Sequence, residues 1–127
     1  MTAQQLRDAC PALLGTREEW PFREPSPSVF KVGGKIFAIS RLEVEPLTVS
    51  LKCEPGLAEE LRASHPEIQP GYHLNKRHWN TVRLDGGLPD EMVLAMIEDS
   101  YDLVVDGLPR SRRPVRRQTG TSAVSTS

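Results

Sequence analysis

The side chains with the most chemical potential lie in one segment, residues 70–80. It holds a phenol, two imidazoles, two amides, two cations and an indole, on Tyr72, His73, Asn75, Lys76, Arg77, His78, Trp79 and Asn80. Lysine and arginine pair with phosphates, histidine and asparagine form directional hydrogen bonds, and an aromatic ring can stack on a base. The segment is therefore a candidate for contact with a phosphate or a nucleic acid. Viewed alone, it favours a purely structural role, with the aromatic rings as core anchors and the cations on a solvated turn.

Metal binding and catalysis are less consistent with the same residues. His73 and His78 are five residues apart, which suits metal ligation on neither a helix nor a strand, and the sequence contains no CxxC or HExxH motif. Either histidine could act as a general base, but the sequence has neither a GxSxG motif nor a phosphate-cradling glycine loop. Cys10 and Cys53 are too few for a disulfide scaffold. We expect a protein that is not an enzyme and holds no metal or cofactor.

Hydrophobic periodicity predicts the elements that position this segment. We expect one α+β domain, an antiparallel sheet with helices on one face, in the order helix, three or four strands, helix, two strands, helix. Thr2 is a plausible cap for the first helix, which Pro11 should kink or split and Gly15 should end. The other expected elements are a short strand from residue 16, strands 29–32, 35–39, 47–52 and 80–84, and helices 55–64 and 89–105.

Gly33 and Gly34 separate two strand-like runs and predict a tight hairpin, because glycine accepts the positive φ of both turn positions. A two-residue loop places Phe30 opposite Phe37. One face would then carry the apolar core residues Phe30, Val32, Phe37 and Ile39.

Charge is distributed unevenly along the chain. The formal net charge is −1, but five arginines and no acid follow residue 109, so residues 1–109 carry −6. Residues 110–127 are rich in Arg, Ser and Thr and predict a disordered tail. The longest apolar run, residues 92–97, is far shorter than the roughly 20 residues that span a bilayer, and the N-terminal residues do not form a signal peptide. We therefore expect a cytoplasmic protein that does not enter membranes.

Three stretches resemble the MmcQ/YjbR-like family. Residues 30–38 are similar to its first hairpin, residues 72–82 to its tyrosine-histidine-x-asparagine-lysine-x-histidine-tryptophan motif, and residues 100–109 to its closing helix. The resemblance covers roughly residues 3–109. It implies an α+β fold related in shape to type III secretion chaperones and the frataxin-like group, and a DNA-binding role in which hairpins act as paired wings.

The resemblance and the charged residues together give the leading hypothesis, a DNA-binding protein. Lys76 and Arg77 would pair with phosphates, as would Lys31 and Lys35 from the hairpin, and Trp79 would anchor the loop or stack on a base. The polar contacts would come from Tyr72, His73, Asn75, His78 and Asn80. Two alternatives remain: a protein that binds a small aromatic ligand, such as an antibiotic, and a chaperone-like partner of other proteins. We expect a monomer, and the chaperone-like alternative would instead predict a dimer with an exposed apolar patch.

Overall fold

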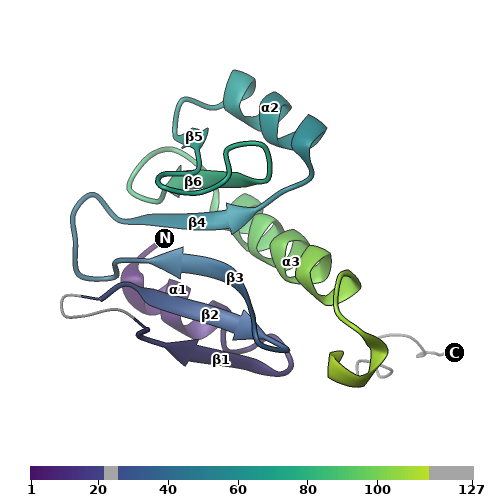
Figure 1. Ribbon diagram of the computed structural model, residues 1–127. Coiled ribbons are helices and arrows are strands. Elements are labelled where there is room, and N and C mark those ends of the chain that lie inside the picture. Colours follow the sequence, from purple (N-terminus) through teal and green to yellow (C-terminus); the bar gives the residue numbers. More distant parts are fainter. Residues whose placement is uncertain (22–25, 115–127) are drawn as a thin grey trace, which may run out of the picture.

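The computed structural model describes residues 1–21 and 26–114, which form an α+β domain with a six-stranded antiparallel sheet. The predicted order of elements is confirmed (Figure 1). Neighbouring strands follow the order β1-β2-β3-β4-β6-β5. The elements are α1 (Ala3–Ala9), β1 (Thr16–Glu19), β2 (Ser28–Val32), β3 (Lys35–Ser40), β4 (Thr48–Lys52), α2 (Pro55–Ser64), β5 (Ile68–Pro70), β6 (Trp79–Arg83), α3 (Asp90–Asp106) and the 3-10 helix η1 (Arg110–Arg112).

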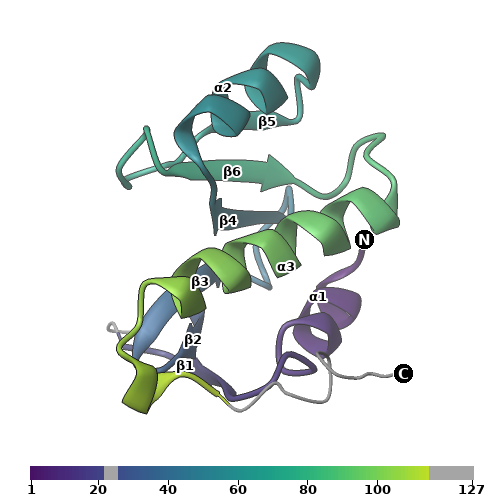
Figure 2. The ribbon, with the colours of Figure 1, turned by 90° about the vertical axis from the view of Figure 1, so that its right-hand side faces the viewer.

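The three helices lie on one side of the sheet, where they bury the hydrophobic core (Figures 1 and 2). Leu6 of α1 and Ile97 of α3 pack there with strand residues such as Val49 and Val82. The predicted alternation of β4 is confirmed, because Val49 and Leu51 are buried in that core. The opposite face of the sheet carries none of these helices and is available for a site.

The turn of the predicted hairpin is confirmed, but the register of its strands is not. Gly33 and Gly34 have φ values of 58° and 83°, and Val32 pairs with Lys35 as expected. Further along, the register shifts by one residue, because Lys31 pairs with Ile36 whereas Phe30 pairs with Ala38. The chain therefore contains a β-bulge, which a two-residue turn alone does not reveal.

Because of the bulge, the residues that share the core face differ from those predicted. Phe30 pairs with Ala38 rather than with Phe37, and Phe37 is the extra residue. Phe37 still enters the core, where its ring meets that of Tyr101 edge to face at a centroid distance of 5.4 Å. Ile39 does not share this face: it is half-buried and lines a groove on the helix-free side. The inserted residue changes the alternation, so the two positions no longer point the same way.

Both ends of the domain differ from the predicted boundaries. Thr2 caps α1 as predicted, with its Oγ1 accepting a hydrogen bond from the N–H of Gln5 at 3.1 Å. α1 then ends at Ala9, ahead of Pro11, rather than continuing through a kink. At the other end, η1 extends the regular structure past the predicted boundary at residue 109. Arg113 holds this segment, because its guanidinium donates to the carbonyls of Leu108 and Asp106 at 2.9 and 3.0 Å. The rest of the predicted tail, residues 115–127, lies outside the described residues.

Within residues 1–21 and 26–114, none of the helices combines the length and apolar character needed to cross a membrane.

Candidate nucleic-acid interface

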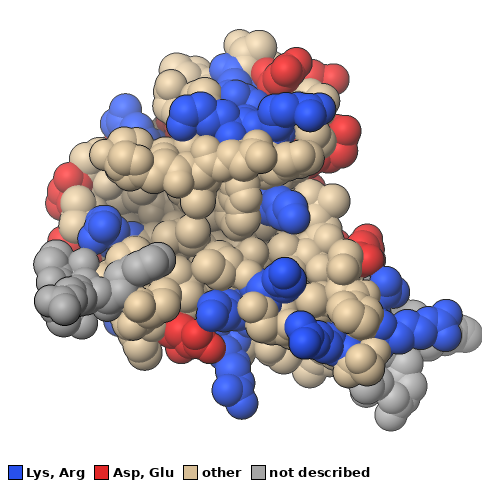
Figure 3. All heavy atoms as spheres, viewed as in Figure 1, with Lys and Arg blue, Asp and Glu red and all other residues tan. Residues whose placement is uncertain are grey.

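A groove of about 750 Å³ is hollowed into the helix-free face of the sheet. Its floor includes Ile39 of β3, Ser50 of β4 and Thr81 of β6, while Val44 and Tyr72 come from the loops on either side. Figure 3 views this face and shows lysine and arginine side chains above and beside the hollow. The groove residues, a name used below for its lining, are Pro27, Ile39, Ser40, Arg41, Val44, Pro46, Thr48, Ser50, Gln69, Pro70, Tyr72, His73, Leu74, Lys76, Thr81 and Arg83.

Strand pairing places one wall of the groove. β6 pairs with β4 and with β5, and the N–H of Gly71 donates to the carbonyl of Trp79 at 2.8 Å, which continues the β5–β6 ladder into the loop. A Cβ at Gly71 would lie 2.7 Å from the Cβ of Trp79, so only glycine fits this close approach. The loop that follows is further closed by hydrogen bonds from the N–H of Leu74 to the carbonyl of Gly71 and from the N–H of His78 to that of Asn75.

Two rings from this loop stand at the rim of the groove. The side chain of Tyr72 is 71% exposed, and its ring lies 4.0 Å, centroid to centroid, from that of His73 at an interplanar angle of 50°. His73 has a φ of 58°, a left-handed conformation that is uncommon for a residue with a Cβ. The N–H of Tyr72 donates to Thr81 Oγ1 at 3.0 Å, and that hydroxyl lies 2.8 Å from Ser50 Oγ. The floor of the groove thus fixes the backbone that carries the two rings.

Other predicted site residues shape the loop more than they face the groove. Asn75 Oδ1 accepts a hydrogen bond from the N–H of Arg77 at 2.9 Å, as in a tight turn. Lys76 Nζ donates to the carbonyl of Gly71 at 2.9 Å, although Lys76 also lines the groove. Arg62 of α2 donates to the carbonyl of Lys76 at 3.0 Å. The loop is therefore held in place before any ligand arrives.

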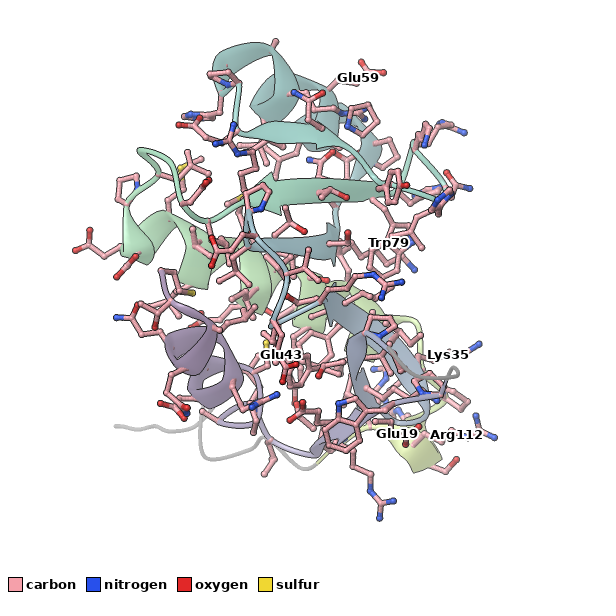
Figure 4. The ribbon with its side chains drawn as sticks, turned by 90° about the vertical axis from the view of Figure 1, so that its left-hand side faces the viewer. Glu19, Lys35, Glu43, Glu59, Trp79 and Arg112 are labelled. Carbon is pink, nitrogen blue, oxygen red and sulfur yellow. The ribbon has the colours of Figure 1, made fainter. Side chains whose placement is uncertain are left out.

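The remaining predicted site residues lie outside the groove. Lys31 forms an ion pair with Glu19 at 3.0 Å, and Lys35 is exposed at the turn of the hairpin. Arg77 is exposed and His78 is half-buried, but neither lines the hollow. Trp79 is also half-buried, on the helix-free side of β6 (Figure 4).

Asn80 points the other way, which does not fit the predicted external contact. It is 3% exposed, and its Nδ2 lies 3.5 Å from the carbonyl of Ala58 on α2. Alternation along β6 explains this, because Asn80 shares the core-facing side with Val82 while Thr81 faces the groove.

Two cations of the groove were missing from the predicted site, Arg41 and Arg83. Arg83 could have been inferred, since a strand with Val82 and Leu84 inward places Arg83 outward. Its Nε and Nη2 contact the carboxylate of Asp85 at 3.1 and 3.3 Å, and this pairing raises the pKa of the guanidinium. Arg41 could not have been inferred, because it lies in the connection between β3 and β4. Hydrophobic periodicity does not predict the path of such a connection.

A family model of YjbR matches residues 11–103 of this chain. The chain belongs to the YjbR family. It is 40% identical to the protein YjbR of Escherichia coli K12 over 114 residues, which cover 89% of this chain and 95% of that protein. It is 41% identical to YbdF of Escherichia coli O157:H7 over 99 residues, which cover 76% of this chain and 80% of YbdF. Both relatives are described as uncharacterised, so membership of the YjbR family supports the fold and brings no activity with it.

Solved structures resemble this YjbR-family domain closely. The crystal structure of the Deinococcus radiodurans protein DR2400 is 40% identical, with a TM-score of 0.81 over 93% of this chain and 86% of that one. A crystal structure of a Pseudomonas syringae protein is 31% identical, with a TM-score of 0.71 over 81% of this chain and 98% of that one. The α+β architecture expected from the sequence is therefore shared with experimentally determined structures.

The two sides of this YjbR-family domain differ in charge. The groove residues include three cations, Arg41, Lys76 and Arg83, and no aspartate or glutamate. On the other side of the sheet, α3 carries six acidic residues and no basic one. The lining of the groove is therefore cationic although residues 1–109 carry −6, while Glu43 and Glu45 flank its wall residue Val44 and Asp85 pairs with Arg83.

Proposed function

We propose that this chain is a non-enzymatic, cytoplasmic DNA-binding protein that contacts DNA through the groove residues. The three cations that line the groove are the observation that supports this most directly. Lysine and arginine side chains that neutralise phosphates release counterions, and this release dominates affinity for nucleic acids. An acidic body opposes such binding unless its acids lie away from the contact, and here α3 places six of them behind the sheet.

A salt titration tests the proposal. We would measure DNA affinity by fluorescence anisotropy for the wild type and for an Arg41→Gln/Arg83→Gln double variant. Each lost phosphate contact should make the slope of log K against log salt shallower by about 0.7–0.9. The matched control is Arg7→Gln, because Arg7 is exposed on α1, which lies on the helix side of the sheet. Equal affinities and slopes for the wild type and the double variant would overturn the proposal.

The size and lining of the groove favour a second candidate, a small aromatic ligand. Its volume of about 750 Å³ falls within the roughly 300–1,000 Å³ of small-molecule sites. Apolar side chains such as Val44, Leu74 and Ile39 line it beside the Tyr72 ring. A thermal-shift screen with polycyclic aromatic compounds tests this candidate: a ligand at 100 times its Kd should stabilise the fold by about 2.7 kcal/mol. If no compound in the screen raises the Tm of the wild type, the small-ligand hypothesis fails.

A further inference from the structure

The ring of Tyr72 is the most exposed large hydrophobic side chain in the described part of the chain, at 71%. Its backbone is held in place, because its own N–H is bonded to Thr81, and its ring lies against that of His73. A flat, exposed aromatic surface on a fixed backbone suits stacking on a nucleobase, which every base allows through its π-face. Unpaired bases of a single strand can reach such a ring, whereas the bases of a duplex are already stacked inside it.

The shape and the lining of the groove also favour a single strand. Its floor is formed by strands, with the apolar Ile39 beside the hydroxyls of Ser50 and Thr81, and its loop walls carry Val44 and Tyr72. A duplex presents its phosphates to the rim and keeps its bases inside, so it would leave this largely apolar lining uncovered. A single strand can turn its bases toward the floor and bury apolar surface there.

The cations are placed for an extended anion rather than a compact one. Thr48 pairs with Arg83 and Lys52 pairs with Trp79, so Arg83 marks one end of the β4–β6 pair and Trp79 the other. Four residues of antiparallel strand span about 13 Å. Lys76 belongs to the Trp79 end, since its Nζ bonds the carbonyl of Gly71 and Gly71 bonds Trp79. A cationic side chain thus stands at both ends of the groove, although Asp85 offsets the charge of Arg83.

We infer that the groove takes single-stranded DNA in preference to duplex DNA, with one base stacked on the Tyr72–His73 ring pair. Phosphates farther along the strand, rather than the two that adjoin this base, lie toward Lys76 at one end of the groove and Arg83 at the other. This inference rests on the proposed DNA-binding function and deepens it by naming the form of DNA. It also assigns a function to the Tyr72–His73 pair, base stacking, that duplex binding would not require.

The test compares single-stranded and duplex DNA in the same anisotropy assay at about 0.1 M salt. The probes are a labelled oligothymidine of about 12 nucleotides, within the roughly 4–16 nucleotides covered by single-strand-binding domains, and the same strand paired with oligoadenosine. The wild type should bind the single strand more tightly than the duplex. Tyr72→Ala should weaken single-strand binding by about 5- to 150-fold, the range for loss of one stacked base, and should leave duplex binding within a factor of about two.

Tyr72→Phe is the matched control, because it keeps the ring and should keep the wild-type affinity for the single strand. Both substitutions affect an exposed side chain, so circular dichroism and Tm should match the wild type. Duplex binding as tight as single-strand binding, or equal losses for Tyr72→Ala and Tyr72→Phe, would overturn the inference. If duplex binding still showed the salt slope carried by Arg41 and Arg83, the proposed DNA-binding function would stand. Failure to bind either probe would overturn both.

Discussion

Replacing Ser100 by alanine should destabilise the domain well beyond an ordinary serine-to-alanine change. Ser100 on α3 is fully buried, and its Oγ donates to the carbonyl of the bulged residue Phe37 at 2.6 Å while accepting from the N–H of Lys52 at 2.8 Å. Alanine removes both bonds at once and leaves a carbonyl and an N–H without a partner. A buried group left unsatisfied costs about 1–3 kcal/mol. Because Lys52 is half-buried and water reaches part of this pair, we expect a loss of about 2–3 kcal/mol in the free energy of unfolding.

Urea denaturation followed by circular dichroism measures this loss as a lower midpoint with an unchanged slope. Ser50→Ala is the matched control, because that hydroxyl bonds Thr81 Oγ1 at the groove, where water can replace it. We expect the control to lose less than about 1 kcal/mol. Equal losses for the two variants, or a loss below about 0.5 kcal/mol for Ser100→Ala, would refute the idea that this hydroxyl ties α3 to the bulge and to the end of β4.

Two other predictions concern the thiols and the hairpin. Burial raises the pKa of the Cys10 thiol to about 12 and also raises the pKa of Cys53, so both are protonated near pH 8, and iodoacetamide should modify Cys53 slowly and Cys10 only after unfolding. Mass spectrometry would show this, and rapid labelling of Cys10 in the folded protein would contradict it. Gly34→Ala has open space and should cost only the left-handed backbone penalty of about 1–2 kcal/mol, whereas Gly33→Ala places a Cβ 2.4 Å from Cδ1 of Leu108 and should cost more. Equal midpoints in urea would show that Leu108 does not pack on the turn.

Local rules predicted the elements of the fold because their signals lie within a few residues of one another. The cap at Thr2, the glycine turn at Gly33 and the alternation around Val49 each depend on neighbouring side chains and backbone angles. The bulge at Phe37 was not predictable in this way. It is stabilised by Ser100, 63 residues away along the chain, and that partner exists only once α3 packs on the sheet.

The candidate site was predicted in part, for a related reason. Three of the predicted residues, Tyr72, His73 and Lys76, do line the groove, and hydrogen bonds at Gly71 and Asn75 close the turns of their loop locally. Which of its side chains face outward depends on the pairing of β6 with β4 and β5, and this pairing sends Thr81 outward and Asn80 inward. Ile39 and Arg41 joined the groove through the bulge and the β3–β4 connection, two features that periodicity does not encode.

The layering of the domain has a consequence for how its charge is felt. The outward carboxylates of α3 stand about one helix diameter, roughly 10 Å, behind the sheet, while the Debye length at 0.15 M salt is about 8 Å. A polyanion at the groove is therefore largely screened from that acidic layer, and the isoelectric point of the chain says little about its behaviour there. In dilute buffer near 0.01 M the screening length grows to about 30 Å. The acidic side chains of α3 then repel the same polyanion. As the salt concentration falls, the affinity of the protein for that polyanion should therefore rise less steeply than the number of phosphate contacts at the groove alone predicts.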